Sequence, residues 1–364
     1  MKIAFYAPLK SPHHPVPSGD RLMACQLMAA LTASGHRVAV VSEFRSFARD
    51  PDAAASPTLQ AAADAETARI ATLWRREGAP DLWFCYHPYY KAPDRLGPNL
   101  CQMFGIPYVT AETSYSARRN LGAWANAQAL VLQGVSQAAV NICLTRRDFD
   151  GLLAGAPQAR VARLPPFIDA TRFLAEQSEP QPNHLMTVAM MRAGDKFDSF
   201  KFLAQALARI ADEPWVLSVI GDGPLRAEVM ALFKNFAPGK ILWHGEKTAD
   251  EIAVLLSSAA LYVWPGCGEA YGLAYLEAQA AGLPVIAQNI AGVPEVVQAE
   301  ETGILTPPGD VSAFAAAILQ LLTDDLQRRS MARAARRFVG DERSSSIAAL
   351  RLQDILKTHL EFAA

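Results

Sequence analysis

The sequence predicts an α/β protein made of two doubly wound, Rossmann-like parallel-sheet domains, and three observations support this. The chain has 364 residues, enough for two domains of roughly 150 residues each. Short runs rich in β-branched residues alternate with longer helical patterns, as in a parallel sheet covered by helices on both faces. The alternation occurs on both sides of a polar linker at 174–184 that contains two prolines. We therefore expect two domains that face each other across a cleft.

The first domain, residues 1–173, is predicted from five strand-like runs. They are KIAFYAP (2–8), RVAVVSE (37–43), LWFCYH (82–87), PYVTAE (107–112) and LVLQGVS (130–136). Between the first two runs, the stretch 20–36 has apolar residues near helical spacing and stops at Gly35, so the domain is expected to open as strand, helix and strand.

The second domain, residues 185–343, repeats the pattern with six strand-like runs. They are LMTVAMM (185–191), WVLSVIG (215–221), KILWHG (240–245), ALYVWPG (260–266), LPVIAQ (283–288) and GILTP (303–307). Helical stretches such as 200–210 and 311–325 separate them.

Composition excludes several other classes of protein. Hydrophobic residues make up 51% of the chain and charged residues 19%, a balance typical of soluble globular proteins rather than disordered ones. The N-terminal run lacks the features of a signal peptide, and no stretch reaches the ~18 apolar residues of a membrane span. The five cysteines are scattered without metal or redox spacing. Reduced thiols in a cytoplasmic protein are therefore expected.

The charge is divided unevenly along the chain. Residues 1–175 hold 18 Lys+Arg against 13 Asp+Glu, whereas the remainder holds 16 against 23. Nucleic-acid binding usually needs a concentrated basic face, so the modest excess in the first half argues against it. The excess still permits an anionic surface or substrate as partner.

In open parallel sheets, ligands bind outside the carboxyl ends of the strands. The segment EAYGLAYLEAQAAGLPV (269–285) follows a strand, and it places Glu269 in a glycine-containing loop and Glu277 inside a helix expected over about 273–281. Two such acids can accept hydrogen bonds from the hydroxyls of two sugar rings, although two glutamates alone are more often ordinary surface acids. The backbone N–H groups at the start of this helix, from Tyr271, Gly272 and Leu273 onward, would donate to an anion or to hydroxyl groups of a ligand.

Two cations follow the strand at 185–191. Arg192 and Lys196 could neutralise a diphosphate leaving group without a metal, so no catalytic divalent ion is expected. The alternative is that both are solvated charges at the start of a helix. Gly221 and Gly223 follow another strand, but the third glycine and the acidic residue of a dinucleotide site are absent.

The first domain offers candidates of its own. Gly19 opens the first helix, where a bare backbone and the helix dipole would let a diphosphate approach closely. His87 ends a strand, and a structural and a functional role are weighed equally for it. An acceptor site is suggested by Glu112, Tyr115 and Arg118; the arginine, together with Arg119, could instead form a solvated helix face.

These residues resemble a known family. The pair Glu269 and Glu277, followed by AAGLPVIA (280–287), AGVPEVV (291–297) and TGILTPPGD (302–310), is similar to the retaining glycosyltransferases of the GT-B fold, family 4, also called glycosyltransferases group 1. The resemblance extends over most of the chain and is strongest over 185–310.

The resemblance implies roles for the residues that match. Glu269 would contact the transferred sugar, and Glu277 would hold the ribose of the nucleotide. Arg192 and Lys196 would stabilise the departing diphosphate, although Phe197 stands where relatives have a glycine. The G-D-G-P-L match at Gly221 and Gly223 favours a nucleotide domain, and the WHGEK turn with His244 and Gly245 would lie against the base.

The resemblance also bears on the first domain and on the C-terminus. His87 would lie near the transferred sugar, whereas Glu112 stands where relatives often have a histidine. Relatives commonly have two glycines where this chain has Ser18 and Gly19. The final helical segment, about 344–364, is expected to cross back and pack on the first domain.

The expected function is that of a retaining glycosyltransferase. It would move a sugar from a nucleoside diphosphate sugar to a glycan or lipid-linked acceptor, in cell-envelope polysaccharide or glycolipid synthesis, with no cofactor and no metal. An epimerase of the same fold and a non-catalytic sugar-nucleotide binding protein are alternatives. The first domain is expected to contact an anionic membrane peripherally through Arg45, Arg49, Arg69, Arg75, Arg76, Arg118, Arg119, Arg146 and Arg147.

Overall fold

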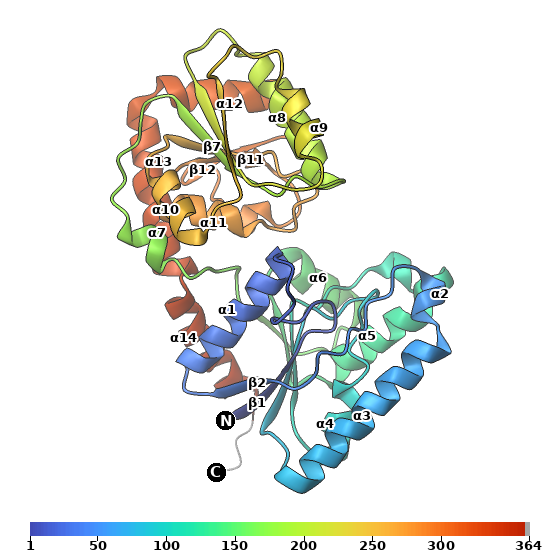
Figure 1. Ribbon diagram of the computed structural model, residues 1–364. Helices are drawn as coiled ribbons and strands as arrows, with labels where there is room; N and C mark the ends of the chain where they lie inside the picture. Colours follow the sequence, from blue (N-terminus) through green and yellow to red (C-terminus); the bar gives the residue numbers. More distant parts are fainter. Residues whose placement is uncertain (361–364) are drawn as a thin grey trace. The chain divides into compact units, whose positions relative to one another are not determined.

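The computed structural model describes residues 1–360, and the chain divides into two compact units (Figure 1). The N-terminal unit comprises Met1–Pro165 and the segment that begins at Ser345, and the C-terminal unit comprises Pro166–Ser344. Each unit contains one six-stranded sheet in which all neighbouring strands are parallel. The prediction of two doubly wound α/β units is therefore confirmed.

The sheet of the N-terminal unit has the strand order β2-β1-β3-β4-β5-β6. Its strands are β1 (Lys2–Tyr6), β2 (Arg37–Val40), β3 (Leu82–Tyr86), β4 (Tyr108–Ala111), β5 (Val140–Cys143) and β6 (Val161–Arg163). The residues of β3, β4 and β5 are all buried, which explains why these strands are almost continuous apolar runs. The helices are α1 (Gly19–Ala33), α2 (Pro51–Ala54), α3 (Pro57–Glu77), α4 (Gly97–Phe104), α5 (Ala125–Gln137) and α6 (Arg146–Gly155).

The last described helix, α14 (Ser345–His359), packs against α1 in this unit (Figure 1). The Ser34 hydroxyl at the end of α1 donates to the Ala349 carbonyl at 3.0 Å. This helix corresponds to the segment expected over about 344–364, of which residues 361–364 lie outside the described part of the chain.

One predicted strand is wrong. Residues 130–136 form part of α5, and the strand that pairs with β4 is β5, ten residues later in the chain. Ala127, Val131 and Val135 are buried at a spacing of four residues, which is the period of a helix face. Short apolar runs of this kind do not distinguish a helix from a buried strand by hydrophobicity alone.

The sheet of the C-terminal unit has the order β12-β11-β10-β7-β8-β9. The strands are β7 (His184–Val188), β8 (Val216–Ile220), β9 (Ile241–Gly245), β10 (Leu261–Val263), β11 (Val285–Gln288) and β12 (Gly303–Thr306), at the six predicted runs. The helices are α7 (Thr171–Ala175), α8 (Asp195–Ala208), α9 (Arg226–Leu232), α10 (Ala249–Ser257), α11 (Leu273–Ala280), α12 (Val311–Thr323) and α13 (Asp325–Phe338), and a π-helical turn follows at Val339–Arg343.

The segment expected to be a linker, 174–184, belongs to the C-terminal unit. The Arg336 guanidinium donates to the backbone oxygens of Leu174 and Glu176, and the Glu179 N–H donates to the Ser257 carbonyl at 3.0 Å. The division between the units therefore lies at Pro165 and Pro166, and not after residue 173. Among residues 1–360, no helix combines the length and the apolar character that crossing a bilayer requires.

Candidate functional site

The loop between β10 and α11, at the carboxyl end of the C-terminal sheet, can be formed only with glycines at fixed positions. Gly266, Gly268 and Gly272 have φ of 69°, 70° and 80°, in the left-handed region. A Cβ atom on Gly268 would lie 2.3 Å from the carboxyl carbon of Asp195, and one on Gly272 would lie 2.7 Å from the Tyr275 ring. The glycines noted in the sequence therefore allow the loop to pack closely.

The same loop is anchored on both sides, so Glu269 is presented from a rigid support. The Cys267 N–H donates to the Ser199 hydroxyl at 2.9 Å, and the Gly292 N–H donates to the Ala270 carbonyl at 2.7 Å. The Tyr275 hydroxyl, on α11, donates to the Trp264 carbonyl at 3.0 Å. A site held in this way is suited to positioning reacting groups.

Lys196 and Glu269 are brought together at this edge. The Lys196 ammonium, in the first turn of α8, donates to Glu269 Oε1, and both side chains are only partly buried, with 23% and 18% of their surface exposed. The ammonium also lies 5.4 Å from the centroid of the Trp264 ring. A cation and a carboxylate from elements 73 residues apart in the sequence thus form a single polar centre.

Arg192 lies in the exposed loop before α8. Strand β7 ends at Val188, three residues earlier than the predicted run, so the Arg192 backbone is part of a loop rather than the direct continuation of the strand. Within the described residues, the Arg192 guanidinium forms no hydrogen bond or ion pair, so its charge is available to a ligand.

Glu277 lies in the second turn of α11, and no hydrogen-bond donor among residues 1–360 reaches its carboxylate. The side chain is only partly exposed. Burial raises the pKa of its carboxyl group to about 7, and the positive charge of Arg172 counteracts only part of this effect. A carboxylate without a partner and with a raised pKa is suited to accept hydrogen bonds from a ligand.

Gly221 and Gly223 are needed for packing between two loops. Their φ values are 133° and 153°, and Cβ atoms there would lie 2.0 Å from the Ala189 carbonyl oxygen and 2.4 Å from the Met191 carbonyl oxygen. The Met191 N–H donates to the Asp222 carbonyl at 2.9 Å. These glycines therefore join the loops that follow β7 and β8, and in this way support the loop that carries Arg192.

The His244 side chain is engaged within the sheet. His244 Nε2 and His184 Nε2 each lie 2.8 Å from the Ser218 hydroxyl, so this hydroxyl on β8 bridges two imidazoles on the flanking strands β9 and β7. Burial lowers the pKa of both imidazoles. Gly245 has φ of 68° and accepts from the Gly221 N–H at 2.8 Å. The His244 side chain is therefore occupied, and the backbone of His244 and Gly245 is what remains of these two residues for contact with a ligand.

In the N-terminal unit, His87 and Glu112 directly follow β3 and β4, and both have strained backbones. Their φ values are 58° and 57°, which non-glycine residues rarely adopt, and such strain is concentrated at functional sites. Glu112 Oε2 accepts from the Tyr86 hydroxyl at 2.8 Å, and His87 Nδ1 lies 3.3 Å from Asp20 Oδ1. The sheet edge thus holds a histidine among acids.

The charge state of His87 follows from these neighbours. Burial disfavours its charged form, but the carboxylates of Glu112, Asp20 and Asp148 outweigh burial and raise its pKa to about 9. Burial also raises the pKa of Glu112. Sequence reasoning missed Asp20 and Asp148: the first directly follows the candidate Gly19, whereas nothing in the local sequence connects the second to His87.

The other candidates of this unit have different surroundings. Gly19 is the first residue of α1, which Ser18 caps, and a Cβ atom on Gly19 would meet nothing within 4 Å. The Tyr115 hydroxyl accepts from Asn120 at 2.6 Å, and a Cβ on Gly155 would come within 2.7 Å of the Tyr115 ring. Tyr115 therefore packs against α6. Arg118 is exposed on the 3₁₀ turn Ala117–Arg119.

Two Asp-x-Asp pairs occur in the sequence, at 50–52 and 148–150. Asp50 caps α2, Asp148 accepts from the Thr145 hydroxyl at 2.6 Å, and Asp150 pairs with Arg146. In the part of the chain that the structure describes, no group of three or more His, Cys, Asp or Glu side chains is arranged to hold a metal ion.

Comparison with known proteins relates this geometry to a family. Residues 182–324 match the family described as "Glycosyl transferases group 1". N-acetyl-alpha-D-glucosaminyl L-malate synthase of Bacillus anthracis is 35% identical over 142 residues, which are 38% of this chain and 37% of that protein. The chain thus spans well under half the length of this relative. The range 182–324 that matches the family contains Lys196, Glu269 and Glu277.

Solved structures extend the similarity to the whole fold. Sucrose-phosphate synthase from Thermosynechococcus elongatus aligns with a TM-score of 0.71 and 21% identity over 98% of each chain. The Anabaena protein HepE in complex with UDP aligns with a TM-score of 0.70 and 15% identity, over 98% of this chain and all of that one. The resemblance to GT-B glycosyltransferases that the sequence indicated is confirmed by the family match and by the fold.

Proposed function

We propose that this protein is a retaining glycosyltransferase that moves a sugar from a nucleoside diphosphate sugar to a hydroxyl group of a glycan or lipid-linked acceptor. The observation that carries the proposal is the contact between Lys196 and Glu269. A sugar nucleotide has a phosphate next to a ring with hydroxyls. Lys196 offers a cation for the phosphate, and Glu269 offers a hydrogen-bond acceptor for the hydroxyls.

Further residues of the C-terminal unit support donor binding. Glu277 accepts hydrogen bonds from the ribose hydroxyls, because its carboxylate has no partner within the described chain. Arg192 adds a second cation for the diphosphate. Backbone N–H groups from Tyr271 to Leu273 at the start of α11 and the backbone of Gly245 form the rest of the donor site in this unit.

The reaction breaks the bond between the sugar C1 atom and the diphosphate oxygen and forms a bond from C1 to the acceptor oxygen on the same face. The acceptor proton passes to the departing diphosphate oxygen, which gains the electron pair of the broken bond. Arg192 and Lys196 stabilise the negative charge that grows on that oxygen. Residues of the chain thus supply the charge stabilisation, and no metal is required in this proposal.

His87 acts as a charged hydrogen-bond donor in this scheme. Its pKa of about 9 keeps the imidazole protonated at neutral pH, so it is not a general base there. A protonated imidazole can donate to a hydroxyl of the transferred sugar. This state agrees with a mechanism in which the leaving phosphate, and not a side chain, receives the acceptor proton.

The acceptor and the cellular place belong to the proposal as well. We place the reaction in the cytoplasm, in cell-envelope polysaccharide or glycolipid synthesis, with peripheral contact to an anionic membrane through the N-terminal unit. The five cysteines are all free thiols in the structure, as expected in a reducing compartment. The acceptor candidates are Glu112, whose backbone is strained, Arg118, which is exposed, and Tyr115, whose half-buried ring packs beside Gly155.

The test measures donor cleavage with purified protein and UDP-, GDP- and ADP-sugars, with and without a crude lipid or glycan acceptor. We expect release of nucleoside diphosphate that depends on the acceptor, and product with the anomeric configuration of the donor. The activity should survive EDTA. Interconversion of free sugar nucleotides would indicate an epimerase, and binding without turnover would indicate a sensor; the named relatives favour neither.

A further inference from the structure

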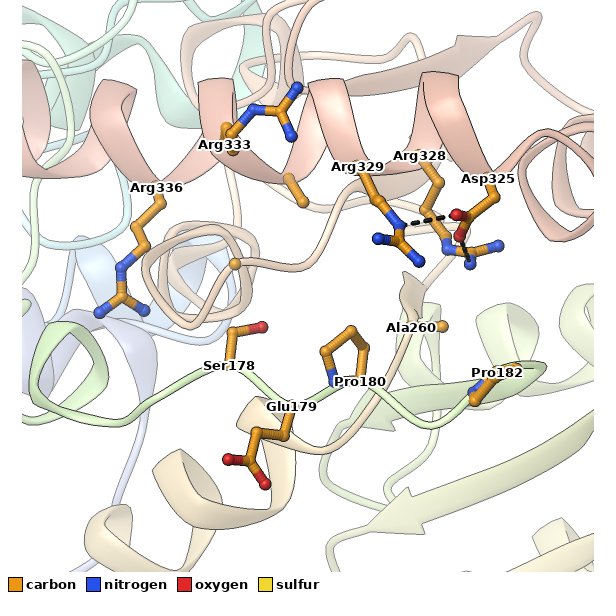
Figure 2. Close-up of a pocket in the computed structure, with 12 residues that line it drawn as sticks. Ser178, Glu179, Pro180, Pro182, Ala260, Asp325, Arg328, Arg329, Arg333 and Arg336 are labelled. Atoms are coloured by element: carbon orange, nitrogen blue, oxygen red, sulfur yellow. Dashed lines mark hydrogen bonds and ion pairs between the residues drawn. The ribbon is translucent and has the colours of Figure 1, made fainter.

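The C-terminal unit contains a pocket that the donor site does not use. It has a volume of about 530 Å³ and lies between one face of α13 and the segment 178–182 (Figure 2). Ala260, just before β10, and Gly282, just before β11, form part of its lining. The pocket is therefore at the amino ends of the strands, whereas Lys196 and Glu269 lie at the carboxyl ends.

The wall opposite α13 is fixed in place. Backbone N–H groups of Glu179 and Gln181 donate to the carbonyls of Ser257 and Ser258 at 3.0 and 2.9 Å. Pro180 and Pro182 face the pocket from this segment. Since two prolines and two backbone hydrogen bonds restrict the segment, the pocket is a preformed feature of the unit.

The lining is unusually basic for its surroundings. The C-terminal unit, residues 166–344, holds 15 Lys+Arg against 22 Asp+Glu, yet α13 holds five arginines and one aspartate. Four of these arginines line the pocket, against the two acids Asp325 and Glu179: Arg328, Arg329, Arg333 and Arg336. The net charge of the lining is thus positive within an acidic unit.

The four arginines are not equivalent. Arg336 donates to the carbonyls of Leu174, Glu176 and Ala280, and Arg328 donates to Asp325 and to the Leu321 carbonyl. These two therefore build the walls. In Figure 2, Arg336 extends from α13 down beside Ser178, and Arg328 lies next to Asp325.

The other two arginines are less engaged within residues 1–360: Arg329 pairs with one acid through its Nε, and Arg333 has no partner. Arg329 is 70% exposed and shares Asp325 with Arg328, with its Nε 2.6 Å from Asp325 Oδ2. Arg333, one helical turn further, is exposed and forms no hydrogen bond or ion pair within residues 1–360. Guanidinium groups bind phosphate through paired N–H donors, and these two lie on one helix face at a spacing of four residues.

The size of the pocket indicates more than a bare ion. Pockets for small organic ligands have volumes of roughly 300–1,000 Å³, and this one lies within that range. Pro180, Pro182, Ala260 and Ala332 provide apolar surface beside the arginines. The chemistry suits a ligand with one phosphomonoester group on an organic body.

We propose that this pocket is a second, non-catalytic site that binds a soluble organic phosphate, with the phosphate held by Arg329 and Arg333 and the organic body against Pro180 and Ala260. The proposal does not depend on the proposed transferase activity. It concerns different residues at the opposite ends of the same strands.

Calorimetry of the full chain with glucose 6-phosphate, in the presence of saturating UDP, tests the proposal. We expect saturable binding that UDP does not displace, weaker binding of inorganic phosphate and none of glucose. The Arg329→Gln, Arg333→Gln double variant should bind glucose 6-phosphate at least tenfold more weakly, with unchanged thermal unfolding. Ala332→Phe, which fills the pocket and keeps all the arginines, should also abolish binding.

Arg337→Gln is the matched control, because Arg337 is exposed on the same helix but does not line the pocket. Its affinity should stay within twofold of the wild type. Equal weakening by Arg337→Gln, or no saturable binding of glucose 6-phosphate, would overturn the proposal. Binding only to vesicles of phosphatidic acid, lost in the double variant, would overturn the assignment to a soluble phosphate. Failure of UDP to bind bears only on the proposed function.

Discussion

Lys196 and Glu269 illustrate how much of the candidate site is decided by single side chains. The glutamate lies on a loop fixed by glycines and backbone hydrogen bonds, and the lysine is in the first turn of α8. Their contact holds both side chains before any ligand binds. A preorganised cation stabilises developing negative charge more effectively than one that must first be ordered.

Replacing Lys196 by alanine should therefore lower turnover much more than it lowers stability. We expect kcat to fall by about 100-fold, as when one preorganised stabilising group is removed from an active site. Lys201→Ala is the control, because Lys201 is a half-exposed lysine on the same helix whose ammonium pairs with Asp198 and lies 4.7 Å from the centroid of the Phe197 ring, away from Glu269. Steady-state kinetics measure both variants. Wild-type turnover of the Lys196 variant would contradict the leaving-group role.

Glu277 should make donor binding depend on pH. Its carboxyl group has a pKa of about 7, so the fraction in the ionised form rises between about pH 6 and about pH 8. The ionised form accepts hydrogen bonds from ribose more strongly, by about 1.5–3 kcal/mol for a charged group. Affinity for a nucleoside diphosphate should therefore increase with pH through this range.

Glu277→Gln separates this effect from ionisation of the ligand, which is the same for both proteins. The wild-type affinity, measured by calorimetry, should be close to that of the variant at about pH 6 and about tenfold higher at about pH 8. A ratio that does not change with pH would remove the ribose role of Glu277.

Sequence reasoning identified candidates at the carboxyl end of the C-terminal sheet because local patterns mark them. Glu269 and Glu277 belong to one motif, and Lys196 closely follows a strand. Sequence reasoning could not find Asp148 beside His87, since 61 positions separate them and only the folded sheet brings them together. It also did not reveal that the Tyr115 ring packs beside Gly155, 40 residues later in the chain. Packing between elements that are distant in the sequence leaves no local pattern.

At the scale of elements, the six strands of the C-terminal sheet were predictable because each is an apolar run bounded by glycine, proline or charged residues. Strand β6 (Val161–Arg163) was missed because it has three residues, all half-buried. The pocket beside α13 was also not predicted. The arginines at 328, 329, 333 and 336 follow helical spacing, but they line a pocket only because segment 178–182 forms the opposite wall.

The loops at the carboxyl ends of the strands lead to a paired prediction. Gly221→Ala should destabilise the protein by on the order of 2 kcal/mol, because its Cβ would lie 2.0 Å from the Ala189 carbonyl oxygen at φ of 133°. Gly19→Ala should leave stability unchanged, since a Cβ there meets nothing within 4 Å. Denaturant unfolding followed by circular dichroism measures both.

Gly19→Ala should also affect ligand binding, although it does not affect stability. Gly19→Ala is expected to weaken binding of a nucleoside diphosphate sugar while the fold is intact, because the diphosphate contact expected from the sequence needs a bare backbone at the start of α1. If the affinity of Gly19→Ala equals that of the wild type, the N-terminal end of α1 has no part in donor binding.

At the scale of the whole molecule, charge differs between the units. The N-terminal unit holds 19 Lys+Arg against 14 Asp+Glu, and the C-terminal unit has an acidic excess. Many basic side chains of the N-terminal unit are already paired: Arg69 with Glu66, Arg76 with Glu77 and Arg146 with Asp150. Attraction to an anionic surface must therefore come mainly from the arginines that lack an acidic partner.

Vesicle flotation should accordingly show weak binding that depends on anionic lipid and on salt. Each basic residue near the surface contributes about 1 kcal/mol, and screening shortens the range of this attraction from ~30 Å at 0.01 M salt to ~8 Å at 0.15 M. We expect binding to anionic vesicles at low salt, loss of most of it at physiological salt, and none to neutral vesicles. The Arg49→Gln, Arg118→Gln double variant removes two exposed arginines without an ion pair in the described chain and should weaken binding further. If the wild type does not float with anionic vesicles even at low salt, the proposed membrane contact is wrong, and the acceptor must reach the enzyme from solution.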